Sequence, residues 1–207
     1  MRTSLYQSYA LAQDCLVVQM SFSGITARAV EAATLVKKQG ASLWAFTADG
    51  GSPLAALADR CILKPDTGEN EAVGFQITMV MLLLIGIGLA ERLGRVRPAQ
   101  SAAIRALLSS SPADMTRTLA LSAPAAKAFA ASIEDAPHVL FLGSGPTWGT
   151  AVNATARVME ASGTSASAQD IEEWVHLDRW IADKRLPVVL LAPPGPGSDR
   201  ALEVARA

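Results

Sequence analysis

The stretch Cys15-Leu-Val-Val-Gln-Met-Ser-Phe-Ser-Gly-Ile-Thr26 decides the fold of this chain. Its first part, residues 15–20, is a short apolar run that predicts a buried strand. A turn rich in hydroxyl side chains, residues 21–26, ends the strand, and a helical pattern then runs as far as Gln39, before Gly40. This order favours anion binding, because backbone N–H groups, hydroxyls and the helix dipole all stabilise negative charge at a helix N-terminus.

The same alternation continues after this first helix. Strands are predicted at residues 42–47 and 61–64, and a short helix that Pro53 opens is predicted at residues 53–58. Strand, helix and strand at this spacing indicate an α/β fold with right-handed parallel crossovers. In such a fold, ligands bind at the carboxyl ends of the strands.

The pattern restarts in the second half of the chain. We predict strands at 138–143, 165–168 and 186–192, a helix at 148–160, a helix N-capped by Asp170, and a short terminal helix. The two halves therefore predict two related units, 1–95 and 136–207. Alanine-rich helices that Pro98, Pro112 and Pro124 interrupt are expected to connect them over residues 96–135.

The segment from Ala72 to Ala90 is 19 residues long and carries no charge. Its length is close to that of a membrane-spanning helix, but a helix buried in an α/β core or in a dimer interface can be equally apolar. Gln76 and Thr78 lie in its first half. We therefore predict a buried helix and no membrane partner.

Composition describes a folded protein with a large core. Of the 207 residues, 50% are hydrophobic and 18% are charged, and the formal net charge of −1 gives no electrostatic reason to expect nucleic-acid binding. Cys15 and Cys61 lie in apolar, strand-like runs, so we expect buried free thiols in a reducing, cytoplasmic setting. Two cysteines without neighbouring histidines predict no metal site.

Several motifs resemble the SIS (sugar isomerase) domain family. S-F-S-G-I-T at 21–26 and A-D-G-G-S-P-L-A-A-L-A-D at 48–59 resemble one such domain. V-L-F-L-G-S-G-P-T-W-G-T-A at 139–151, with V-M-E at 158–160, resembles the opening of a second. The resemblance implies a parallel three-layer α/β/α sandwich in a tandem SIS protein, such as the isomerase half of glucosamine-6-phosphate synthase. The first unit would lack its opening strand and the second its closing part, as in a fragment.

The resemblance also implies a phosphate site at residues 21–26. Ser21, Ser23 and Thr26 match the family's hydroxyl positions, and Phe22 and Gly24 would contribute their backbone. A simpler interpretation is that Thr26 or Ser23 only caps the helix. In the second unit, the turn Gly143, Ser144 and Gly145 would allow a close backbone approach and could contact the ligand.

The proton transfers implied by the resemblance belong to the second unit. Glu160 matches the family's base, and Arg157 stands where that branch has a lysine near the substrate. His176, sixteen residues after Glu160, would assist ring opening from a neighbouring subunit, and Glu173 matches a glutamate of the same loop. The simpler interpretations are a solvated helix residue for Glu160 and a surface ion pair for His176.

The function implied is isomerisation between an aldose and a ketose phosphate, or deamination of an aminosugar phosphate, through an enediol(ate). The reaction requires a phosphorylated sugar and acid–base side chains, and it requires no cofactor. SIS proteins typically form homodimers, so we expect a homodimer. The alternative is a non-catalytic sugar-phosphate-binding module. The family's G-V-A-S-T-K stretch is replaced by residues 74–79, which are closer to the G-F-A-M-T of isomerases for aminosugar-derived ketose phosphates.

Overall fold

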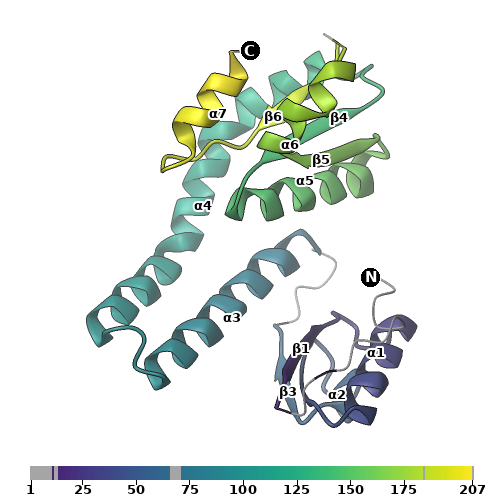
Figure 1. Cartoon of the computed structure of the whole chain (residues 1–207), viewed down its shortest axis with the longest axis vertical. Coiled ribbons are helices and arrows are strands. Elements are labelled where there is room, and N and C mark those ends of the chain that lie inside the picture. Colours follow the sequence, from purple (N-terminus) through teal and green to yellow (C-terminus); the bar gives the residue numbers. More distant parts are fainter. Residues whose placement is uncertain (1–10, 12–13, 66–70, 184, 207) are drawn as a thin grey trace. The chain divides into compact units, whose positions relative to one another are not determined.

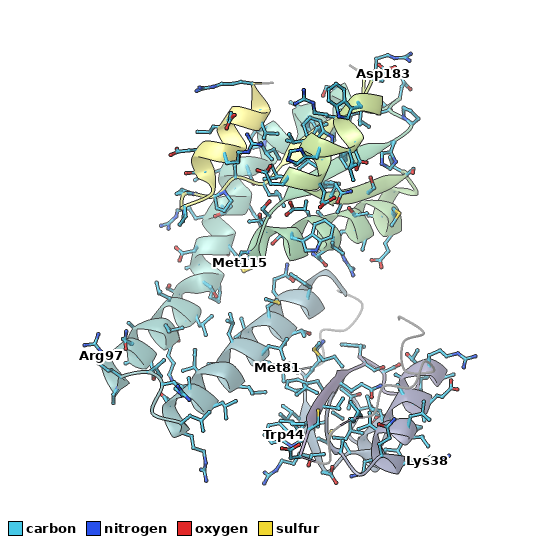
Figure 2. The ribbon with its side chains drawn as sticks, viewed as in Figure 1. Lys38, Trp44, Met81, Arg97, Met115 and Asp183 are labelled. Atoms are coloured by element: carbon cyan, nitrogen blue, oxygen red, sulfur yellow. The ribbon has the colours of Figure 1, made fainter. Side chains whose placement is uncertain are left out.

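The computed structural model describes residue 11 and residues 14–65, 71–183 and 185–206. The chain divides into two compact units, Met1–Ser110 (unit 1) and Ser111–Ala207 (unit 2). Each unit contains its own three-stranded parallel sheet (Figure 1). The prediction of an α/β fold with parallel strands is therefore confirmed.

The sheet of unit 1 consists of β1 (Leu16–Met20), β2 (Ser42–Thr47) and β3 (Arg60–Leu63), in the order β1-β2-β3. Helix α1 (Ala27–Lys38) connects β1 to β2, and α2 (Pro53–Leu57) connects β2 to β3. All of these elements were predicted to within a few residues. Helix α1 ends as its sequence indicates, because Gly40 takes up a positive φ of 78° directly after the C-cap.

The core of unit 1 lies between this sheet and its two helices. Leu43 and Ala45 point from the central strand to one face, since side chains alternate along a strand. They form one buried cluster with Ala33 and Val36 of α1 and Leu54 of α2. Burial of this face fixes the carboxyl edge of the sheet, where the residue 21–26 turn begins.

The sheet of unit 2 has the order β5-β4-β6. Its strands are β4 (Val139–Gly143), β5 (Ala166–Asp170) and β6 (Val188–Leu190); its helices are α5 (Pro146–Ser162), α6 (Ile171–His176) and α7 (Ser198–Ala205), with a short 3-10 helix η2 (Asp178–Ile181) after α6. Asp170 caps α6 as predicted, because its carboxylate accepts a hydrogen bond from the Glu172 N–H.

Both faces of the central strand β4 are covered by helices (Figure 1). Leu140 and Leu142 pack with residues of α6 and α7 on one face. Val139 and Phe141 pack with Ala151 of α5 on the other. Unit 2 thus has the predicted three-layer α/β/α arrangement.

Two long helices occupy the middle of the chain, α3 (Glu71–Arg92) and α4 (Pro98–Ser132). The expectation that prolines break residues 96–135 into several helices is wrong, because Pro112 and Pro124 lie inside one continuous helix. Each interior proline removes one backbone donor at a cost of about 3 kcal/mol, and the alanine-rich neighbours are the strongest helix formers. Pro98 stands at the first helical position, where proline is tolerated.

Helix α3 is apolar but is not buried within the described part of the chain. Its segment Gly74–Arg92 has a mean hydropathy of 1.8, long and apolar enough to cross a membrane by length and composition, and 6% of it is buried. Exposed side chains include Phe75, Met79, Leu83 and Leu89. Packing among the described residues does not provide the predicted burial, and burial in a dimer interface, the other alternative, stays a prediction.

The cysteines differ from expectation in one respect. Both are free thiols, and Cys15 is partly buried, but Cys61 is exposed. The reason is topological, since β3 is an edge strand of its sheet and its apolar sequence does not imply burial.

Candidate functional site

The turn at residues 21–26, called here the serine loop, leaves β1 at the carboxyl edge of the unit 1 sheet. Its backbone continues the parallel ladder for one more step, because the Ser21 N–H donates to the Phe46 carbonyl at 3.0 Å. The Phe22 carbonyl then accepts two hydrogen bonds, from the Ala48 N–H at 2.8 Å and from the Thr47 hydroxyl at 2.9 Å. The end of β2 therefore holds the first half of the serine loop in place.

Gly24 is the point of closest packing in the serine loop. It is buried and adopts a φ of 65°, which side chains rarely allow. A Cβ at this position would overlap the Ser52 hydroxyl and lie 2.9 Å from the Thr47 hydroxyl oxygen. The Gly24 carbonyl also accepts a hydrogen bond from the Leu54 N–H at 3.1 Å. The serine loop is thus fixed against the turn that begins α2, and Ser52 is a structural residue of the site that sequence analysis did not single out.

The hydroxyls of the serine loop are not used to cap α1. Thr26 is the N-cap residue, but its side chain makes no capping hydrogen bond. Ser21 Oγ accepts a hydrogen bond from the Gly24 N–H at 3.2 Å and thereby shapes the turn. Ser23 and Thr26 are exposed, and the first turn of α1 carries no acidic residue. Exposed hydroxyls at a helix N-terminus can bind an anion.

Lys64, directly after β3, is a cation beside the serine loop. Its side chain is buried with 9% of the residue exposed, and its Nζ lies 5.5 Å from the centroid of the Phe22 ring. The same Nζ donates a hydrogen bond to the Gly74 carbonyl at 3.3 Å. Burial lowers the pKa of the Lys64 amine. No sequence pattern indicated this residue, because its neighbours come from three separate segments.

The glycine turn of unit 2 lies at the carboxyl edge of the second sheet. A Cβ on Gly143 would lie 2.5 Å from the Thr147 carbonyl oxygen, and Gly145 has a φ of 56°, so both positions suit glycine. Ser144 Oγ donates to Asp170 Oδ2 at 2.9 Å. The other Asp170 oxygen caps α6, so this carboxylate connects the predicted ligand turn to the helix that carries Glu173 and His176.

Glu160 and Arg157 lie together near the C-terminal end of α5. Their side chains form an ion pair of 2.8 Å, and 57% of the Glu160 side chain is exposed. Helix α5 starts at the carboxyl edge and runs back, so Glu160 lies towards the amino edge of the sheet, close to the start of β5. The predicted base therefore does not lie in a partly desolvated pocket formed by unit 2 itself.

His176 ends α6, which begins at the opposite, carboxyl edge. Its side chain is 74% exposed, and its Nε2 lies 3.7 Å from a carboxylate oxygen of Glu172. Glu172 is held by Arg200 of α7 through hydrogen bonds of 2.6 and 3.0 Å, and these bonds lower the pKa of the Glu172 carboxyl. Unit 2 alone does not bring His176 and Glu160 together.

The described residues contain no group of acidic, histidine and cysteine side chains that could hold a metal ion. Side chains beside the serine loop include the hydroxyls of Thr47 and Ser52 and the amine of Lys64. Groups of this kind suit an anionic ligand rather than a cation.

The serine loop lies in a segment that matches a known protein family. Residues 7–86 match the model of the SIS domain family. This segment is a SIS domain. The match contains β1, α1, β2, α2 and β3 and therefore the whole serine loop. The prediction of this family is confirmed for the first unit, whereas a second SIS unit at residues 136–207 and the absence of terminal parts stay predictions.

The chain is similar to curated proteins over most of its length. A glutamine–fructose-6-phosphate aminotransferase (isomerizing) of Pseudomonas aeruginosa is 29% identical over 192 residues, which are 91% of this chain and 31% of the relative. The enzyme of the same name from Aliivibrio fischeri is 27% identical over 193 residues, with the same coverage. The chain thus spans about a third of the length of these relatives.

Solved structures share the fold. The C-terminal domain of glucosamine-fructose-6-phosphate aminotransferase from Francisella tularensis superposes with a TM-score of 0.90 at 22% identity, covering 98% of this chain and 58% of that one. A Bacillus subtilis protein described as a phosphosugar isomerase gives 0.78 at 26% identity, covering 92% of this chain and 58% of that one. The chain therefore has the fold of phosphosugar isomerases.

Proposed function

We propose that this chain binds a phosphorylated sugar at the serine loop and acts as an aldose–ketose isomerase or an aminosugar-phosphate deaminase. The observation that carries the proposal is the serine loop itself, a rigid turn with exposed hydroxyls at the N-terminus of α1. The names of the relatives support a sugar phosphate as the ligand, since they are a fructose-6-phosphate aminotransferase and a phosphosugar isomerase.

The chemistry proposed for Glu160 is a proton shuttle on the open-chain sugar. Its carboxylate would remove the proton from C2 of the aldose to give an enediol(ate) over C1 and C2. The O2 proton would pass to O1, and the carboxylic acid would return its proton to C1 to give the ketose. His176 would move a proton on or off the ring oxygen when the ring opens. The serine loop would hold the phosphate and thereby position the reacting carbons.

This mechanism requires a homodimer. Glu160 is on α5 and His176 is on α6, which cover opposite faces of one sheet, and both side chains are largely exposed. A second copy of the chain could supply His176 to the Glu160 of its partner and exclude water from that carboxylate. The exposed apolar surface of α3 is a further reason to expect association, since patches of this kind mark contact surfaces.

A ligand panel tests the binding part of the proposal. Thermal unfolding of the chain should shift upward with fructose 6-phosphate, glucose 6-phosphate and glucosamine 6-phosphate, because a ligand that binds only the folded state stabilises it. The unphosphorylated sugars should give no shift at the same concentration. Equal shifts with fructose and fructose 6-phosphate would contradict a phosphate site.

The second candidate function is a sugar-phosphate-binding module without catalysis. The exposure of Glu160 favours it, since a base that faces water lacks the desolvated environment that such proton transfers use. The variant Glu160→Gln separates the two functions. An isomerase would keep ligand binding and lose turnover by a factor of roughly 10²–10⁴. A wild-type chain that binds the ligand and turns over no sugar phosphate would support the binding module.

A further inference from the structure

The serine loop supplies only neutral groups to an anionic ligand. Its hydroxyls and backbone N–H groups can hydrogen-bond to phosphate oxygens, but Ser21 to Thr26 include no charged side chain. A phosphate monoester carries nearly two negative charges at neutral pH. In α1, Arg28 of the first turn pairs with Glu31, and Lys37 of the last turn pairs with Asp59.

Lys64 lies beside the serine loop and can supply a positive charge to the phosphate group. It follows β3 directly, at the same carboxyl edge as the serine loop, and its N–H donates to the Thr47 carbonyl at 2.8 Å. The hydroxyl of Thr47 in turn bonds the Phe22 carbonyl. The Lys64 ammonium lies 5.5 Å from the centre of the Phe22 ring, so it lies beside the serine loop.

The described surroundings of Lys64 do not balance its charge. The residue is nine-tenths buried, its amine donates to the Gly74 carbonyl, and the amine lies near an aromatic ring. Among the residues that the structure describes, no carboxylate forms an ion pair with its Nζ. Burying a cation in this way costs free energy and is rarely maintained without a partner. A dianionic ligand at the serine loop would be such a partner.

We propose that Lys64 is the cationic partner of the phosphate group bound at the serine loop. The inference rests on the proposed sugar-phosphate site and adds to it the residue that makes the site selective for anions. In a buried environment its charge acts on the ligand far more strongly than an exposed lysine would, because little water screens it. Lys64 therefore discriminates between a sugar phosphate and the free sugar.

The test compares Lys64→Met with Lys38→Met, which removes an exposed lysine of α1. Calorimetric titration measures Kd for fructose 6-phosphate and for inorganic phosphate. We expect Lys64→Met to weaken both by roughly 10- to 100-fold, the range for a lost hydrogen bond or ion contact to a charged group. Lys38→Met should leave both Kd values within about threefold of wild type, which is less than about half of the binding free energy of a tenfold change in Kd.

The stability of Lys64→Met separates ligand binding from a structural role. Methionine fits the space of the lysine stem without a buried charge, so the midpoint of urea unfolding without ligand should stay unchanged or rise. If Lys64→Met fails to fold, Lys64→Gln, which retains a donor for the Gly74 carbonyl, replaces it in the same titration. Wild-type affinity for phosphate in the folded variant overturns the inference about Lys64. Failure of the wild-type chain to bind either ligand overturns instead the proposed function.

Discussion

At the scale of single residues, the serine loop is determined by packing as much as by its own sequence. Gly24 is held between the Ser52 and Thr47 side chains, and Phe22 is held through its carbonyl by the end of β2. These contacts order the serine loop in the absence of a ligand. Preorganised donors bind more tightly than flexible ones, because less conformational entropy is lost on binding.

Gly24→Ala should destabilise the chain strongly. The new methyl group would overlap the Ser52 hydroxyl and would also have to adopt a φ of 65°, so we expect a loss of about 2–5 kcal/mol in urea unfolding. Gly40→Ala is the matched control, since Gly40 has a φ of 78° but no atoms within 4 Å of the added Cβ. It should cost only about 1–2 kcal/mol. Equal losses in the two variants would show that the packing against Ser52 has no effect.

The residues of the loop could be predicted from sequence, and its support could not. Three hydroxyls and a glycine between a strand and a helix form a local pattern, and this pattern predicts Ser21, Ser23 and Thr26 as site residues. Lys64 and Ser52 reach the loop only through the folded sheet. No spacing along the chain reveals contacts of that kind.

At the scale of elements, α6 and α7 are joined by charge. Arg200 makes a two-bonded contact to Glu172 and also pairs with Glu203 on its own helix. Glu172 lies next to His176 as well. Helix α6 is only one and a half turns long, so this contact and the Asp170 cap determine where His176 lies.

The contact to Arg200 should make unit 2 sensitive to acid. The pKa of Glu172 is lowered in the folded state, so its contribution is present above the unfolded pKa near 4.5 and is lost as the pH falls through the folded pKa. Between pH 6 and pH 3, wild type should lose more unfolding stability than Arg200→Met does. Arg206→Met, at an exposed position after α7, is the control and should follow wild type. Parallel pH curves for wild type and Arg200→Met would rule out this contribution.

Helix α4 offers a second prediction for an element. Pro112→Ala restores a backbone donor in the helix interior, so it should raise helix stability by up to about 3 kcal/mol. Pro98→Ala changes the first residue of the same helix, where the N–H has no partner within the helix, and should have little effect. Circular dichroism at 222 nm during thermal unfolding measures both. A larger effect for Pro98→Ala would contradict the assignment of the two positions.

At the scale of the whole molecule, α3 is the element whose covering partner sequence analysis left open. The uncharged run from Ala72 to Ala90 gave its length to within a few residues, and its apolar composition predicted burial. Composition cannot say whether the covering partner lies in the same chain or outside it. A second copy of the chain is the partner that the proposed mechanism requires.

Leu83→Glu tests that partner. Leu83 is 46% exposed on α3, and a carboxylate in an apolar interface is strongly unfavourable. If a second copy covers α3, light scattering should find a dimer for wild type and a monomer for Leu83→Glu at the same concentration. Leu202→Glu, at a position 50% exposed on α7, should remain dimeric. A monomeric wild-type chain would contradict the dimer.

The central claim is that the serine loop binds the phosphate of a sugar phosphate. An NMR titration of the isotope-labelled chain with fructose 6-phosphate tests it most directly, because amide resonances report each N–H separately. The account predicts saturable shifts concentrated at Phe22 to Ala29, reproduced by inorganic phosphate and absent with fructose. Shifts confined to other parts of the chain, or no saturable shifts at all, would contradict it.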